Sequence, residues 1–135
     1  MENLSLDLGV REYGLPGGVI RFNPADPNVY GRFLDLQPKL EAVQTAFAKK
    51  SRGCKEGRQV LALLQEADSQ LKTLLQEVFP GNDFHAALGG MNLLAVNGAG
   101  KSAAQALLEG LEGILSRGAK TLVEQEAKKL QENAE

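Results

Sequence analysis

The stretch of this chain with the most suggestive chemistry is the glycine-bearing segment 95–102, AVNGAGKS. A phosphate-binding loop has the pattern G-x-x-x-x-G-K-[ST] between a strand and a helix. Its backbone N–H groups surround the phosphates, its lysine reaches their oxygens and its hydroxyl holds Mg²⁺. Gly100, Lys101 and Ser102 fit this pattern and Gly98 adds a further loop glycine, but an alanine replaces the first required glycine. These residues raise the hypothesis of a nucleotide-binding module.

The sequence around this segment lacks the rest of a nucleotide-hydrolysing domain. Such domains continue with several strand–helix units and a Walker B strand that ends in aspartate. Only one helical segment and a charged tail follow Ser102. We therefore expect a turn that leads into a helix, with Ser102 or Asn97 supplying the oxygen that caps the helix. A glycine loop at a helix start can still attract an anion weakly.

Other catalytic or metal-binding constellations are missing from the sequence. His85 is the only histidine and Cys54 the only cysteine, so a zinc site of four nitrogen and sulfur ligands cannot be built. The carboxylates, among them Asp68, Glu109 and Glu112, fall on polar helix faces. None is paired in an apolar pocket of the kind that tunes a general acid. We expect a protein that is not an enzyme and has no metal or cofactor.

Composition limits the classes of function further. The 135 residues are the length of one domain, and 15 basic and 17 acidic residues give a formal net charge of −2. Because nucleic-acid binders usually carry a basic stripe, we expect no nucleic-acid partner. No stretch approaches the roughly 18 apolar residues of a membrane-spanning helix, so we expect no membrane partner. A single cysteine excludes an internal disulfide, which favours a reducing, cytoplasmic location.

The N-terminal part of the chain predicts an antiparallel β-hairpin. Leu4, Leu6 and Leu8 alternate with polar residues, which is the period of a half-buried strand. A second strand is expected at residues 19–22, and the glycines and proline of residues 13–18 favour the connecting turn. Because two strands alone are marginally stable, we expect the hairpin to pack on helices or to pair with strands of another subunit.

A helical region should start near residue 26. Asp26 can cap free N–H groups, and Pro27 suits the first turn, where its missing donor costs nothing. Pro38 should kink or restart this helix, because proline cannot donate to the preceding turn. Segment 49–57 is basic and carries two glycines, so we expect an exposed linker there.

The most regular helical pattern lies at residues 60–78, where apolar residues recur at spacings of four and three. We expect this helix to form the core, and a coiled-coil surface for a partner is the alternative. Asp83 should cap a short helix at residues 84–88. A last helix, weakened by three glycines, is expected from residue 103 to residue 123.

Together these segments predict an α+β fold that is mainly α, with an N-terminal β-hairpin followed by a bundle of three to four helices. We expect a single domain at residues 1–123, in which residues 1–23 are the hairpin and residues 26–123 the helical part. Residues 124–135 form a polar C-terminal extension, which is either a solvated helix that frays or an interaction tail.

Five short motifs carry a resemblance to a known group of proteins. The chain resembles small proteins encoded among the tail genes of phages and prophages of Gram-positive bacteria, namely tail assembly chaperones or related tail morphogenesis proteins. The resemblance implies a non-enzymatic, homo-oligomeric protein in the cytoplasm of the bacterial host cell, which binds the phage tape measure protein, the tail tube protein or both. In chain order the motifs are residues 8–13 (LGVREY), 17–18 (GG), 22–26 (FNPAD), 78–81 (VFPG) and 88–95 (LGGMNLLA).

A protein that coats a helix-forming tape measure needs apolar grooves between its own helices, and a hairpin edge offers a site for strand addition. Aromatic side chains are frequent anchors in such interfaces. We therefore expect Tyr30, Phe33 and Phe79 to bind the partner.

Overall fold

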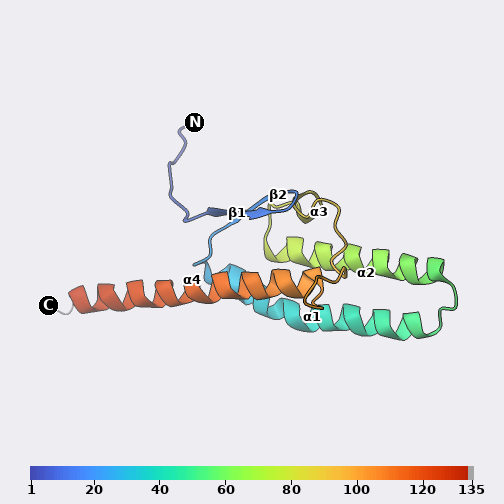
Figure 1. Ribbon diagram of the computed structural model, residues 1–135. Coiled ribbons are helices and arrows are strands. Elements are labelled where there is room, and N and C mark those ends of the chain that lie inside the picture. Colours follow the sequence, from blue (N-terminus) through green and yellow to red (C-terminus); the bar gives the residue numbers. More distant parts are fainter. Residues whose placement is uncertain (134–135) are drawn as a thin grey trace.

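The computed structural model describes residues 1–133 and has an α+β fold that is mainly α (Figure 1). As the sequence predicts, an antiparallel β-hairpin precedes the helices. Within the described residues the elements are β1 (Arg11–Leu15), β2 (Gly18–Phe22), α1 (Pro27–Arg52), α2 (Gly57–Val78), α3 (Phe84–Ala87) and α4 (Ala103–Asn133).

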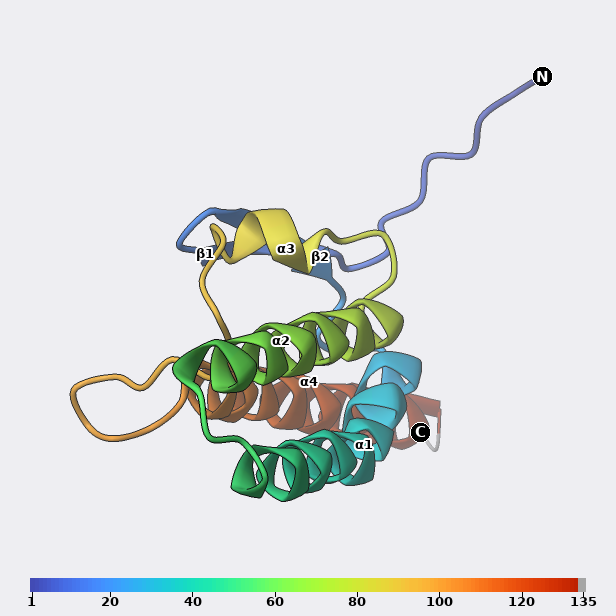
Figure 2. The same cartoon turned by 90° about the vertical axis from the view of Figure 1, so that its right-hand side faces the viewer.

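Three long helices lie side by side, and the hairpin covers one side of them. α1 and α2 form an antiparallel pair joined by the short segment 53–56, and α4 runs antiparallel to α1 (Figure 1). Figure 2 looks along the helices and shows the hairpin and α3 stacked above α2. The C-terminal part of α4 extends beyond the other helices (Figure 1).

The hairpin starts later than the alternation of leucines predicts. β1 begins at Arg11 and pairs with β2 over its full length. The strand expected at residues 4–8 is wrong, because residues 1–10 have no secondary structure. β2 ends at Phe22, opposite Arg11, so the chain offers no strand with which the preceding residues could pair.

Two aspartates start helices as the sequence predicts. Asp26 Oδ1 accepts a hydrogen bond from the N–H of Asn28 at 2.9 Å at the start of α1. Asp83 Oδ1 accepts one from the N–H of Ala86 at 3.1 Å at the start of α3. Both side chains satisfy donors that the first turn of a helix leaves free.

α1 is longer than the sequence predicts, both through Pro38 and at its C-terminal end. It passes through Pro38 as one helix, so the restart expected there is wrong. Phe33 and Leu40 are buried on the two sides of Pro38. Their packing compensates for the stability that is lost because proline cannot donate a helix hydrogen bond. Residues 49–52 belong to α1, so the linker is limited to residues 53–56.

The apolar pattern of residues 60–78 forms α2 and is largely buried. Leu71, Leu75 and Val78 are at most 3% exposed and belong to the main core cluster, which also contains residues of α1, α4 and the hairpin. Burial within this chain is therefore the principal role of this helix face, as expected.

A buried ion pair on α2 fixes the chain that leads to α4. Lys72 is only 4% exposed, and its Nζ donates to Asp68 Oδ2 at 2.9 Å. The other oxygen, Asp68 Oδ1, accepts a hydrogen bond from the N–H of Leu93 at 2.7 Å. The expectation that Asp68 is a solvated surface charge is therefore wrong: its carboxylate joins α2 to the segment before α4.

Four aromatic rings connect the hairpin to the helices. Tyr13 of β1 stacks on Phe22 of β2, with ring centroids 4.7 Å apart. Phe22 lies 4.7 Å from Phe79, which follows α2, and Phe79 lies 5.8 Å from Phe84 of α3. Aromatic pairs at such separations add stability beyond the area that they bury. The rings therefore hold β1, β2, the end of α2 and α3 as one layer.

The polar C-terminal extension is helical within the described residues. α4 continues to Asn133, and residues 124–132 are exposed. This stretch is thus an exposed helix, and residues 134–135 of the expected extension lie outside the described residues.

A close contact fixes where α4 crosses the start of α1. Gly118 is buried, and a Cβ atom added there would collide with the carbonyl group of Pro24. Glycine is required at this position because only a residue without a side chain lets the two backbones approach so closely.

We expect Gly118→Ala to lower the free energy of unfolding by about 2 kcal/mol, because α4 must move away from Pro24 or distort it. Gly110→Ala is the matched control: this exposed helical glycine has open space around it, and alanine there should raise the free energy of unfolding by about 0.5–1 kcal/mol. Urea unfolding followed by circular dichroism measures both. Equal effects of the two substitutions would contradict the role given to Gly118.

Candidate functional site

The loop that resembles a phosphate-binding loop is a small, closed turn before α4. Val96 and Ser102 form an antiparallel bridge, and Gly100 has a φ of +81°, which favours glycine. Ser102 Oγ accepts a hydrogen bond from the N–H of Gln105 at 3.1 Å. Ser102 therefore caps α4, as one of the two predicted capping residues. Figure 2 shows this loop projecting from the bundle.

Several backbone donors of this loop are used inside the loop. Asn97 Oδ1 accepts hydrogen bonds from the N–H groups of Ala99 at 2.9 Å and Lys101 at 3.1 Å. The N–H of Gly100 donates to the carbonyl of Asn97 at 3.0 Å. In a phosphate-binding loop such donors face the anion. The geometry around Gly98 therefore differs from a phosphate cradle, and the segment before the loop is not a strand.

The lysine of the loop is paired with a glutamate of α4. Lys101 Nζ donates to Glu109 Oε2 at 2.8 Å, and Gln105 donates to Glu109 Oε1 at 3.4 Å. The hydrogen bond from Lys101 lowers the pKa of Glu109, with attraction to the Lys101 charge and the Gln105 bond acting in the same direction and burial opposing them. The ammonium that would bind a phosphate is thus held by a carboxylate.

A saturable heat of ATP binding is not expected at millimolar nucleotide, because the amides of Ala99, Gly100 and Lys101 and the Lys101 ammonium already have partners. Isothermal titration calorimetry of the wild-type chain, Lys101→Ala and Lys120→Ala tests this. Lys120 is an exposed lysine farther along α4 and serves as the control. Saturable binding that disappears in Lys101→Ala and persists in Lys120→Ala would establish the nucleotide hypothesis.

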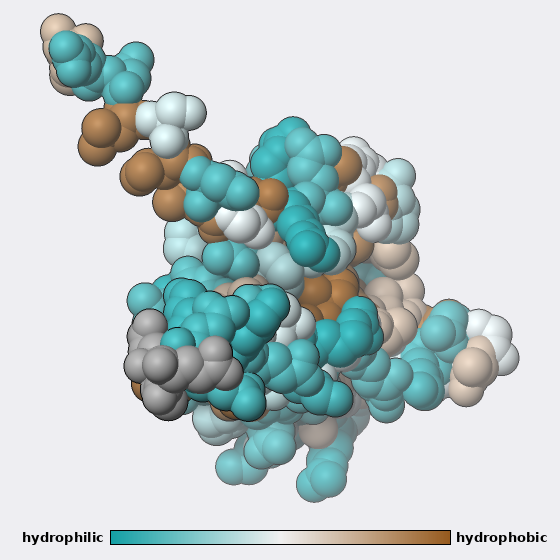
Figure 3. Space-filling view, turned by 90° about the vertical axis from the view of Figure 1, so that its left-hand side faces the viewer, coloured by the Kyte–Doolittle hydropathy of each residue, from teal (hydrophilic) through white to brown (hydrophobic). Residues whose placement is uncertain are grey.

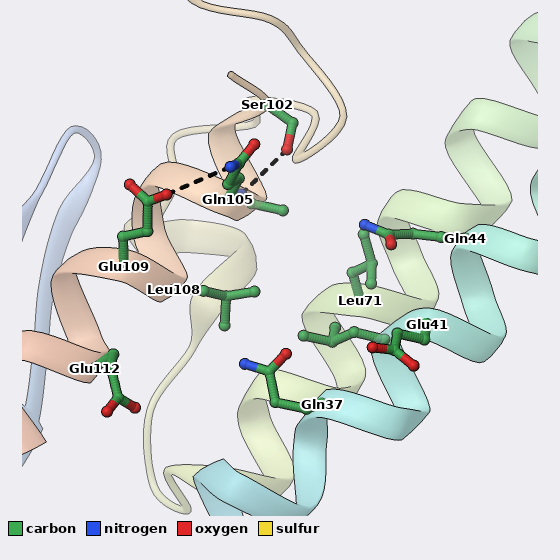
Figure 4. Close-up of a pocket in the computed structure, with 11 residues that line it drawn as sticks. Gln37, Glu41, Gln44, Leu71, Ser102, Gln105, Leu108, Glu109 and Glu112 are labelled. Atoms are coloured by element: carbon green, nitrogen blue, oxygen red, sulfur yellow. Dashed lines mark hydrogen bonds between the residues drawn. The ribbon is translucent and has the colours of Figure 1, made fainter.

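A cleft of about 470 Å³, which we call the central cleft, lies between α1 and α4 (Figure 4). Polar side chains of α1 face polar side chains of α4 across it, and leucines form its floor. It is lined by Gln37, Leu40, Glu41, Gln44, Leu71, Ser102, Ala104, Gln105, Leu108, Glu109 and Glu112.

Two of the three acidic side chains that line the central cleft, Glu109 and Glu112, make structural contacts. Glu109 holds Lys101, and Glu112 Oε1 accepts a hydrogen bond from the Tyr30 hydroxyl at 3.0 Å. This bond to Glu112 raises the pKa of Tyr30, with burial and the Glu112 charge adding to the effect. His85 lies in α3, beside the hairpin, and is absent from the cleft lining. The cleft thus combines no histidine base with a nucleophile.

The structure separates the three aromatic residues that were expected to bind a partner. Phe33 is 0% and Phe79 is 1% exposed, so both lie in the core and neither is a surface anchor. Phe33 faces the bundle from α1, and Phe79 belongs to the aromatic layer described above. Tyr30 is half-buried and borders a second hollow. Of the three, only Tyr30 can contact another molecule in this structure.

This second hollow, which we call the apolar groove, has a volume of about 360 Å³ and lies between the start of α1 and the later part of α4. Leu34 and Val123 border it and are 52% and 67% exposed. Asp26 and Tyr30 are its only titratable residues, and both already make hydrogen bonds within the chain. It is lined by Pro24, Ala25, Asp26, Pro27, Tyr30, Gly31, Leu34, Ala119, Leu122 and Val123.

Pairs of adjacent large apolar residues in the sequence are a signal for this groove. Leu34 follows Phe33 directly, so the two side chains lie about 100° apart around the helix and cannot both be central to one buried face. Leu122 and Val123 are adjacent in the same way on α4. Adjacent large apolar residues on a helix therefore indicated a second apolar surface.

Residues 1–133 contain neither a candidate metal centre nor a candidate membrane span. No group of three or more histidine, cysteine, aspartate or glutamate side chains there is arranged to hold a metal ion. None of the described helices combines the length and apolar character needed to cross a membrane.

In comparisons with known proteins, no family model, curated protein or solved structure matches the chain.

Proposed function

We propose that this chain is a non-enzymatic assembly protein that binds an apolar segment of a partner protein during phage tail morphogenesis. In this proposal it acts like a tail assembly chaperone in the cytoplasm of the bacterial host cell, and its partner is the tape measure protein, the tail tube protein or both. The identity of the partner comes from the resemblance carried by the motifs of residues 8–13, 22–26 and 88–95.

The observation that carries the proposal is the apolar groove. Large apolar side chains gathered around a hollow mark interaction sites more often than exposed hydrophobic residues scattered singly. Leu34 and Val123 stand on opposite walls, one on α1 and the other on α4. A groove with helical walls suits an amphipathic helix, which inserts its own apolar residues at intervals of three and four.

The polar groups near this groove favour an apolar occupant. The Tyr30 hydroxyl donates to Glu112, and the Asp26 carboxylate accepts from the N–H of Asn28. A partner helix that covers these residues therefore leaves neither polar group without a hydrogen bond, which is the usual cost of burying such groups. The central cleft is less suited, because polar and acidic side chains dominate its walls.

Leu34→Glu and Val123→Glu should each weaken partner binding at least about tenfold, because each places a charge against the apolar surface of the bound segment. The measurement is co-purification, followed by titration, with the proposed tape measure and tail tube partners. Circular dichroism should show unchanged folding, since both side chains are already largely exposed.

Leu61→Glu is the matched control for this experiment. Leu61 is 52% exposed, as Leu34 is, but it lies on α2 and is absent from the groove lining. Binding that is equally weak in all three variants would contradict the groove as the binding surface. Unchanged binding in both groove variants would contradict it as well.

A further inference from the structure

The first ten residues, which we call the N-terminal arm, carry an apolar stripe with nothing packed against it. Leu4, Leu6, Leu8 and Val10 are 85%, 68%, 64% and 53% exposed. The arm projects from the body of the molecule, and Figure 3 shows hydrophobic side chains along it. Apolar residues at every second position are the pattern of a strand with one buried face.

The two edges of the hairpin differ. Asn82 caps the edge of β2 at Arg21, because its Oδ1 accepts from the N–H of Arg21 at 2.7 Å and its Nδ2 donates to the carbonyl of Arg21 at 2.9 Å. The backbone groups of Arg21 therefore point away from β1. In an antiparallel pair the groups of the opposite residue point outward on the other side.

The open edge is that of β1. Glu12 is opposite Arg21, and Gly14 lies two residues along the same strand. Both residues are exposed, and no backbone hydrogen bond beyond the hairpin engages them within residues 1–133. An open edge of this kind is a template for an added strand.

We propose that the N-terminal arm of one copy of this chain adds as a strand to the β1 edge of a second copy, and that the second copy does the same in return. The arm and β1 are continuous in sequence, so antiparallel pairing of residues 4–15 from two copies satisfies both arms and both edges at once. Such self-complementarity is the property of a two-fold interface. It favours a second copy over an unrelated partner.

The local geometry of the arm fits this pairing. Gly9 has a φ of +68°, and a single left-handed glycine is typical of a bulge that shifts the alternation of side chains by one residue. This shift brings the even-numbered leucines to the same face as Tyr13 and Leu15, which are only half-buried. Residues 4–10 span about 23 Å when extended, which is enough to cover the five residues of β1.

The base of the arm is held so that it points away from its own hairpin. Asn23 Nδ2 donates to the carbonyl of Leu8 at 2.8 Å, and Asp7 Oδ1 accepts from the N–H of Gly9 at 2.9 Å. The arm leaves the body on the side opposite the hairpin tip (Figure 2). It therefore cannot cover its own β1 edge while these bonds persist, and a second copy can.

Analytical ultracentrifugation of the full chain over a wide concentration range tests the proposal without any other protein. We expect a monomer–dimer equilibrium in the wild-type chain. The double variant Leu6→Glu with Leu8→Glu should weaken dimerisation by about 100-fold or more. Gly14→Pro should weaken it similarly, because proline removes an outward N–H and is tolerated on an edge strand. The control Leu61→Glu should leave it unchanged.

Hydrogen exchange provides a readout that does not depend on any variant. In the wild-type chain, the amides of Glu12, Gly14 and residues 4–8 should gain protection as the concentration rises. A chain that stays monomeric throughout the range, or a dimer unaffected by the arm variant, overturns the proposal. A dimer that is lost in Leu34→Glu but kept in Gly14→Pro places the arm in the apolar groove and also overturns it. These measurements use this chain alone, so the proposed binding of a tape measure or tail tube protein is tested separately from them.

Discussion

The packing of four aromatic rings is the interaction on which the rest of this structure depends. A two-stranded hairpin is marginally stable by itself, and β1 and β2 remain ordered because Tyr13 and Phe22 continue into Phe79 and Phe84. Phe79 comes directly after α2, so the residue that ends this helix also holds the hairpin in place. The hairpin, and the arm that precedes it, therefore take their position from the helical core.

The core and the exposed apolar surface are supplied by the same helices but by different faces. Phe33 and Leu71 are buried between the helices, whereas Leu34 and Val123 remain outside. The buried Lys72–Asp68 pair and its bond to Leu93 fix the entry to α4, and the contact at Gly118 fixes its crossing of α1. These contacts hold the two walls of the apolar groove at a defined separation, so its shape is present before any partner binds.

Local patterns predicted the elements of this fold well. The α+β class, the caps at Asp26 and Asp83 and the core face of residues 60–78 follow from turn chemistry and helical periodicity, which act over a few residues. The predictions that failed concern features that depend on residues far away in the sequence. The strand expected at residues 4–8 has the right alternation but no neighbour in the chain, and Pro38 is carried through α1 by packing that its local sequence does not reveal.

The site was harder to predict because exposure is a tertiary property. Phe33 and Phe79 are aromatic, as interface anchors often are, yet the same apolar character places them in the core. Asp68 has the spacing of a surface charge, and only the docking of residue 93 turns it into a partly buried acceptor. The phosphate-loop pattern at Gly98, Gly100 and Lys101 specifies a backbone that bends, whereas the directions of its donors depend on the Asn97 side chain.

Asn82 has a consequence for the size of any assembly built on the hairpin. A sheet with two free edges can add strands on both sides without limit, which is how fibres grow. Here the side chain of one asparagine in the turn after α2 occupies the backbone groups of Arg21, so β2 offers a new strand no ladder of free donors and acceptors at that point. A sheet shared between copies through β1 would thus have a capped outer strand at each end. The turn that ends the core helix is also what would keep such a sheet finite.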